Sequence, residues 1–178
     1  MRTRIAIVAI LFALLVWTSV LAADKPGIDI PLYPSGEATM EINLTSDDLI
    51  PTLQAMLPMV AGKIADKISP DDLAAALKDV KRVEMLQVDI TKTATEAQVV
   101  DYYAKNLPTG QWNRVFWQKW TKGTMVFYIQ GGGEMLYGFR VQQAMADGKP
   151  IKRVQIVKTE GKIDFVKVLT IAGKVFMP

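Results

Sequence analysis

The fold is decided by residues 114–159, which read RVFWQKWTKGTMVFYIQGGGEMLYGFRVQQAMADGKPIKRVQIVKT. Apolar and polar side chains alternate along four parts of this stretch, and a period of two is typical of half-buried strands. Glycine-containing turn signals separate the four parts at Lys122-Gly123, Gly131-Gly132-Gly133 and Asp147-Gly148. The pattern predicts a meander of four antiparallel strands at Arg114–Trp120, Thr124–Gln130, Met135–Gln142 and Lys152–Thr159.

The chain before the meander mixes two more strand patterns with helix signals. Ala38–Leu44 and Val83–Ile90 alternate and are predicted strands. A helix should begin near Thr45–Asp48, where cap residues and acids precede an apolar stripe, and Pro58 should kink or split it. Further helix starts are predicted at Ser69-Pro70-Asp71-Asp72, at a capping box in Thr93-Ala94-Thr95-Glu96, and at a short amphipathic segment, Asp164–Ala172.

This order of elements predicts an α+β fold. We expect an antiparallel sheet that ends in the four-strand meander, with the helices packed on one face as a two-layer sandwich. Residues 38–178 should form a single domain, and two closely spaced prolines favour an extended arm over residues 24–37.

Residues 1–23 have the pattern of a secretory signal peptide. The segment begins MRTR, continues with an unbroken apolar run from Ile5 to Trp17, and ends in small residues before Asp24. We predict cleavage after Ala22 or Ala23 and a protein that is exported, either periplasmic or secreted. The alternative is an uncleaved membrane anchor, because the whole apolar segment approaches the roughly 20 residues of a spanning helix.

The composition excludes several classes of function. The chain has no cysteine, so it has neither a disulfide nor the lipid attachment site of a lipoprotein. It has no histidine, which excludes histidine-based triads and histidine metal sites, and we predict no cofactor and no metal. Cleavage of the signal would remove Arg2 and Arg4, so the formal net charge falls from +3 to +1. This low charge argues against nucleic acid as a partner.

Charge is divided unevenly along the mature chain. Residues 24–101 carry a net charge of −7, whereas residues 102–178 carry +8. A basic half could bind an acidic envelope protein or an anionic envelope polymer. The other interpretation is that the two halves complement each other, within one molecule or between the molecules of a homodimer.

The meander is also rich in aromatic residues. On a strand, Phe116 and Trp120 should point to one face and Trp117 to the other. One face must be core, so the other should present a large aromatic side chain, either as a stacking platform or packed beneath the N-terminal arm. The predicted candidate binding surface comprises Trp117, Trp120, Arg114, Arg140 and Arg153.

Two segments carry a family resemblance. Val99–Tyr103 with Leu107 and Trp112, and Val157–Asp164 with Val168-Leu169 just after, resemble exported bacterial proteins of the domain-of-unknown-function family numbered 4252. Leu32-Tyr33-Pro34 near the mature N-terminus accompanies them. The resemblance covers roughly residues 46–170. It implies an exported α+β domain of bacterial origin and no catalytic residues.

The carboxylate groupings are Asp47-Asp48, Asp71-Asp72 and the pair Glu160 and Asp164. Paired carboxylates can hydrolyse glycosides, but the first two groupings stand where helix N-termini favour acids. We therefore predict a non-enzymatic exported binding or scaffolding module. The alternatives are a carrier of a lipid or small apolar molecule between helix and sheet, and a carboxylate-based hydrolase.

Overall fold

The structure is a computed structural model that describes residues 30–61, 69–91, 93–121, 123–164 and 167. The chain divides into two compact units. One unit contains Val83–Glu160 together with the segment up to Asn43, and the other contains Leu44–Arg82 and the residues from Gly161 onward. The predicted signal, residues 1–23, lies outside the described residues. Of the described helices, none is long and apolar enough to cross a membrane.

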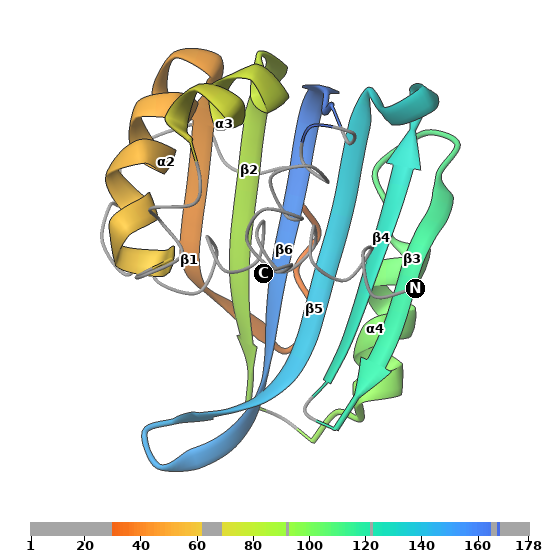
Figure 1. Ribbon diagram of the computed structural model, residues 1–178. Helices are drawn as coiled ribbons and strands as arrows, with labels where there is room; N and C mark the ends of the chain where they lie inside the picture. The colour runs from red at the N-terminus through yellow and green to blue at the C-terminus, as the bar shows by residue number, and fades with distance from the viewer. Residues whose placement is uncertain (1–29, 62–68, 92, 122, 165–166, 168–178) are drawn as a thin grey trace. The chain divides into compact units, whose positions relative to one another are not determined.

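The main element of the fold is a six-stranded antiparallel sheet with the order β1-β2-β6-β5-β4-β3 (Figure 1). Its strands are β1 (Gly36–Thr45), β2 (Asp79–Ile90), β3 (Asn113–Trp120), β4 (Gly123–Gln130), β5 (Met135–Ala146) and β6 (Lys149–Lys162). With its helices, this sheet confirms the α+β class. All six predicted strands are present, and β5, β6 and β2 are longer than their patterns indicated.

Glycine-rich turns join the last strands, as predicted. Between β5 and β6, Asp147 has φ 49° and Gly148 has φ 72°, the left-handed conformations that a tight two-residue hairpin turn requires. A 3-10 turn, η2 (Gly131–Gly133), connects β4 to β5. The β5–β6 ladder extends from Met135–Glu160 to Ala146–Lys149, whereas β4 pairs with β5 only as far as Gln142. The hairpin therefore extends beyond the neighbouring strands (Figure 1).

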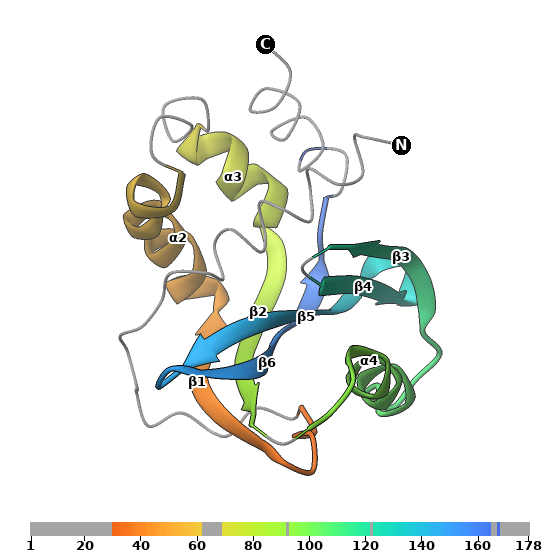
Figure 2. The same ribbon diagram turned by 90° about the horizontal axis from the view of Figure 1, so that it is seen from below.

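Helix α4 (Glu96–Lys105) packs on one face of the sheet, here called the α4 face (Figure 2). Its N-cap is Thr95, whose hydroxyl accepts a hydrogen bond from the backbone N–H of Gln98, and the Gln98 side chain accepts one from the Thr95 N–H. The capping box therefore begins two residues later than predicted, because the glutamine, not a glutamate, closes it.

The core lies between α4 and the sheet. Val99 and Tyr103 of α4 are fully buried against a cluster of apolar side chains. The strand residues of this cluster are Leu86, Val88, Ile90, Val126, Tyr128, Tyr137, Phe139, Val141, Val154 and Ile156. The rings of Tyr103, Tyr137 and Tyr128 each pack against Phe139, with centroids 5.6–6.5 Å apart. Three of the meander aromatics, Tyr128, Tyr137 and Phe139, are thus residues of this core.

The end of the predicted arm is fixed to α4. Ile30 is buried in the same core, and the backbone N–H of Tyr33 donates a hydrogen bond to the Tyr103 hydroxyl at 3.3 Å. The Tyr102 hydroxyl donates to the carbonyl of Leu32. Strand β1 begins at Gly36, whose missing Cβ leaves room for Val88. The arm over residues 30–35 is therefore ordered by backbone contacts to two tyrosines.

The second unit contains α2 (Ser46–Ala61) and α3 (Pro70–Leu77), which contact each other. Ser69 caps α3 by accepting a hydrogen bond from the N–H of Asp72, and Pro70 is its first residue, as predicted. Asp164 accepts one from the N–H of Lys167, which agrees with a helix cap. The rest of the predicted helix up to Ala172 lies outside the described residues.

Candidate binding surfaces

Strand β3 lies at one edge of the sheet and carries three exposed side chains on one face. Arg114, Trp117 and Lys119 pair with Tyr128, Val126 and Thr124 of β4, at every second ladder position. Their partners lie on the α4 face, since Val126 and Tyr128 belong to the core under α4 and Thr124 donates a hydrogen bond to Glu96. Trp117 is 53% exposed, and both basic residues are exposed. We call these three residues the β3 stripe.

A β-bulge at Val115 brings Arg114 onto this face. The pairing shifts between Arg114–Tyr128 and Phe116–Phe127, so Val115 is an extra residue that pairs with nothing on β4. Simple alternation would place Arg114 on the same face as Phe116. Because of the bulge, Arg114 instead lies on the face of Trp117, four ladder positions from Lys119.

Arg114 also contacts the core through Tyr128. The two residues pair in the β3–β4 ladder, and the Arg114 guanidinium lies near the Tyr128 hydroxyl. Burial raises the pKa of the Tyr128 hydroxyl, and the nearby positive charge of Arg114 partly offsets this rise. Arg114 therefore lies beside a core tyrosine, while its own side chain stays exposed.

Two residues of the predicted surface lie on the opposite face of the sheet. Arg140 pairs with Gln155, and Arg153 pairs with Gln142, so the two arginines are diagonal neighbours on strands β5 and β6. Burial lowers the pKa of the Arg140 guanidinium. Trp120 pairs with Gly123 through its backbone, and its side chain lies outside the described part. The structure thus divides the predicted surface between two faces.

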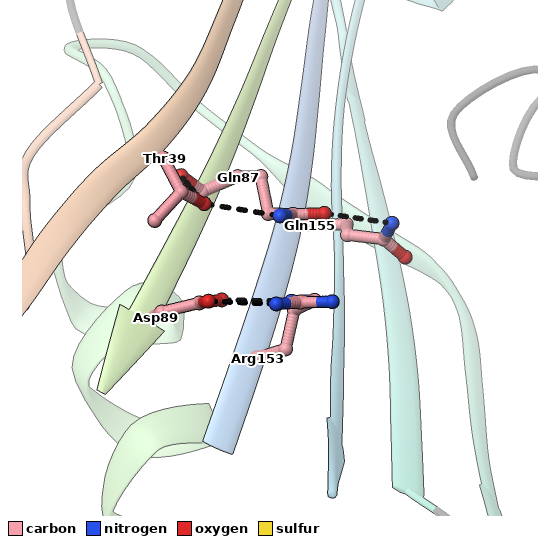
Figure 3. A network of polar contacts seen from close by, with 5 residues as sticks. All are labelled: Thr39, Gln87, Asp89, Arg153 and Gln155. Atoms are coloured by element: carbon pink, nitrogen blue, oxygen red, sulfur yellow. Dashed lines mark hydrogen bonds and ion pairs between the residues drawn. The ribbon is translucent and has the colours of Figure 1, made fainter. Parts of the chain in front are cut away.

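Arg153 is engaged by a carboxylate. Its Nε and one terminal nitrogen donate hydrogen bonds to the two oxygens of Asp89, at 2.8 and 2.7 Å (Figure 3). This bidentate geometry is the strongest that an arginine makes with a carboxylate. Most of the Arg153 charge is compensated within the sheet, so Arg153 does not contribute to the candidate surface.

A chain of amide contacts runs beside this ion pair (Figure 3). The Gln155 amide nitrogen donates to the Gln87 side-chain oxygen at 3.4 Å, and the Gln87 amide nitrogen donates to the Thr39 hydroxyl at 3.0 Å. Within the described residues, the buried Oε1 of Gln155 has no hydrogen-bond partner. This row of side-chain hydrogen bonds links β6, β2 and β1 on the face opposite α4.

A second ion pair is buried on the α4 face. Lys158 Nζ lies 3.1 Å from Glu84 Oε2, and the side chains are 8% and 4% exposed. Lys158 pairs in the ladder with Tyr137, which is fully buried. Burial raises the pKa of the Tyr137 hydroxyl, which has no hydrogen-bond partner within the part of the chain described. Sequence inspection missed this cluster, because its members are far apart along the chain.

No arrangement of side chains for metal binding is found in the described residues. Across residues 30–61, 69–91, 93–121, 123–164 and 167, no group of three or more acidic side chains is placed to hold a metal ion. Asp47 and Asp48 lie in the first turn of α2, and Asp71 and Asp72 lie in the first turn of α3, where acids stabilise helix N-termini.

Comparisons with known proteins found no match to this chain among family models, curated proteins or solved structures. The resemblance to the uncharacterised exported family therefore stays a prediction.

Proposed function

We propose that this protein is a non-enzymatic exported module that binds an acidic partner through the β3 stripe. The observation that carries the proposal is the exposure of Trp117 between two exposed basic residues on one face of an edge strand. Tryptophan and arginine are enriched in protein interfaces, where they often contribute most of the binding energy. The flanking cations supply attraction to negative charge and set its spacing.

The stripe favours an extended acidic protein segment as the partner. Arg114 and Lys119 are four ladder positions apart, which corresponds to about 13 Å along a strand at roughly 3.3 Å per residue. In an extended peptide, every second side chain lies on the same face, so side chains four residues apart match the separation of Arg114 and Lys119. Such a peptide can also pair with the open backbone of an edge strand. The net charge of +8 on residues 102–178 also favours a negatively charged partner.

Poly-L-glutamate is a suitable probe for this proposal, with fluorescence anisotropy as the measurement. We expect binding that weakens strongly between roughly 50 and 200 mM salt, because exposed charges are screened over that range. The double variant Arg114→Gln/Lys119→Gln should lose most of the affinity, and Trp117→Ala should lose part of it. Lys149→Gln, an exposed lysine on the β5–β6 hairpin, is the matched control and should bind normally.

Two results would overturn this function. Binding that is absent, or equally reduced by Lys149→Gln, would remove the role of the stripe. Binding of polygalacturonate without binding of polyglutamate would replace the protein partner by an anionic polymer.

The proposal includes export and a two-layer fold. Export rests on the signal-like residues 1–23, and the intact mass of the exported protein should lack Met1–Ala22 or Met1–Ala23. The two-layer sandwich is supported by α4, whose Val99 and Tyr103 pack into the core of one sheet face. Crosslinks from α2 and α3 to residues of either face would test whether all helices share that face.

A further inference from the structure

The two edge strands of the sheet carry opposite charges in matching patterns. Strand β3 has two charged residues, Arg114 and Lys119, and both are basic. Strand β1, at the other edge, also has two, Glu37 and Glu41, and both are acidic. All four side chains are exposed. Each edge thus presents a doubly charged strand of one sign.

The spacing of the two patterns is the same. On β3 the stripe occupies alternate ladder positions in the order Arg114, Trp117, Lys119. On β1 the residues Glu37, Thr39 and Glu41 alternate in the same way, and Thr39 is also exposed. The bulge at Val115 creates this match, because it reduces the five-residue separation of Arg114 and Lys119 to four ladder positions.

We propose that this face of β3 binds a second copy of this chain, which adds its β1 to the sheet edge. This inference rests on the proposed function, since it names the acidic partner of the β3 stripe. Glu37 and Glu41 of the second copy would lie beside Arg114 and Lys119, with Thr39 beside Trp117. Side chains of opposite charge on neighbouring strands attract each other, which favours this pairing.

The geometry requires that the two strands run parallel. Thr39 contacts Gln87, and Gln87 contacts Gln155, so Glu37, Thr39 and Glu41 lie on the face opposite α4, whereas the β3 stripe lies on the α4 face. In the antiparallel sheet, β1 and β3 run in opposite directions. Turning the second copy over, about an axis in the sheet plane and perpendicular to the strands, reverses both its face and its strand direction. The acidic pattern then meets the basic one.

This contact is head-to-tail, because each copy uses β3 on one side and offers β1 on the other. Contacts of this kind do not close by two-fold symmetry and continue to further copies. A single strand pair buries little surface, so association should be weak and dependent on concentration and salt.

The test uses two charge-reversed variants of the full mature chain and measures mass by sedimentation velocity. One variant is Glu37→Lys/Glu41→Lys, and the other is Arg114→Glu/Lys119→Glu. Wild-type protein should associate at high concentration and low salt, whereas each variant alone should lose at least about tenfold in association constant. An equal mixture should associate again, because the acidic edges of one variant match the basic edges of the other.

Restoration in the mixture also shows that both variants are folded. A wild type that stays monomeric while polyglutamate still binds the stripe would overturn this inference and leave the proposed function standing. If polyglutamate also fails to bind, both proposals fall. Association that only the β3 variant abolishes, and that mixing does not restore, would exclude β1 as the partner strand.

Discussion

Two ion pairs join the same two strands and differ in how far they are buried. Glu84–Lys158 lies on the α4 face, with side chains 4% and 8% exposed and one contact at 3.1 Å. Asp89–Arg153 lies on the opposite face, with side chains 9% and 27% exposed and two hydrogen bonds at 2.8 and 2.7 Å. Both connect β2 with β6.

The difference between them concerns hydration. A fully buried pair loses the hydration of both ions, and their attraction often only balances that loss. Asp89–Arg153 keeps part of its hydration on the arginine and gains two aligned charge-assisted bonds. We therefore expect Glu84–Lys158 to enforce the correct pairing of β2 with β6, and Asp89–Arg153 to add net stability.

The largest effect should come from removing one member of the buried pair. Lys158→Met leaves the buried Glu84 carboxylate without the Lys158 ammonium, and the free energy of unfolding should fall by about 3–5 kcal/mol. Urea denaturation measures this change. The double variant Glu84→Leu/Lys158→Met should recover wild-type stability or exceed it. A double variant no more stable than Lys158→Met would contradict our view of this pair.

A smaller loss is expected on the opposite face. Asp89→Asn keeps the size of the side chain and removes its charge, which should cost about 1–3 kcal/mol in urea denaturation. Arg153→Lys retains the charge and loses the bidentate geometry, so its loss should be smaller. If Asp89→Asn costs as much as Lys158→Met, the distinction between the two pairs is wrong.

Two buried tyrosines test how much a buried polar group depends on its hydrogen-bond partner. Tyr103→Phe removes the acceptor of the Tyr33 N–H and should cost about 1 kcal/mol, whereas Tyr137→Phe removes a buried hydroxyl that has no partner within the described residues and should be neutral or stabilising. Equal losses in the two variants would argue that the Tyr137 hydroxyl is bonded.

The same tyrosines predict a loss of stability at alkaline pH. Burial raises the pKa of both hydroxyls in the folded state, while in the unfolded chain the pKa stays near the ordinary value of about 10. The unfolded state therefore releases its protons first, and stability falls as the pH rises above about 10. Urea denaturation at pH 8 and about pH 11 should show a smaller fall in the Phe variants.

The smallest expected loss of stability comes from the row of side-chain amides on the face opposite α4. Thr39→Val removes the acceptor of the Gln87 amide on an exposed strand and should cost about 0.5–1 kcal/mol. Thermal or urea denaturation measures this loss. A loss larger than that of Asp89→Asn would show that the hydrogen bonds of Gln87 stabilise this face more than the Asp89–Arg153 ion pair does.

Local signals predicted the elements of this fold well. The period-two pattern located all six strands, and Asp147-Gly148 located the last hairpin, because both depend on neighbouring residues alone. The capping box was predicted two residues early, since Thr93 and Thr95 are both acceptable caps and the tertiary fold decides between them.

The candidate site was less predictable. Alternation correctly separates Trp117 from Phe116, but it cannot detect the bulge that moves Arg114 to the face of Trp117. Arg153 forms its ion pair with Asp89, which lies 64 residues away along the sequence. Lys119 joins the candidate surface only because the pairing of β3 with β4 places it on the same face as Trp117. Contacts between distant strands depend on register, and register leaves no local signal.

The bulge at Val115 has a consequence for insertions and deletions. Losing one residue inside a strand normally turns every side chain beyond it to the wrong face. Here Arg114 and Phe116 already pair with adjacent residues of β4, Tyr128 and Phe127. Deleting the single codon for Val115 would therefore preserve every existing pair of this strand, and it would leave a flatter edge that is more prone to aggregation.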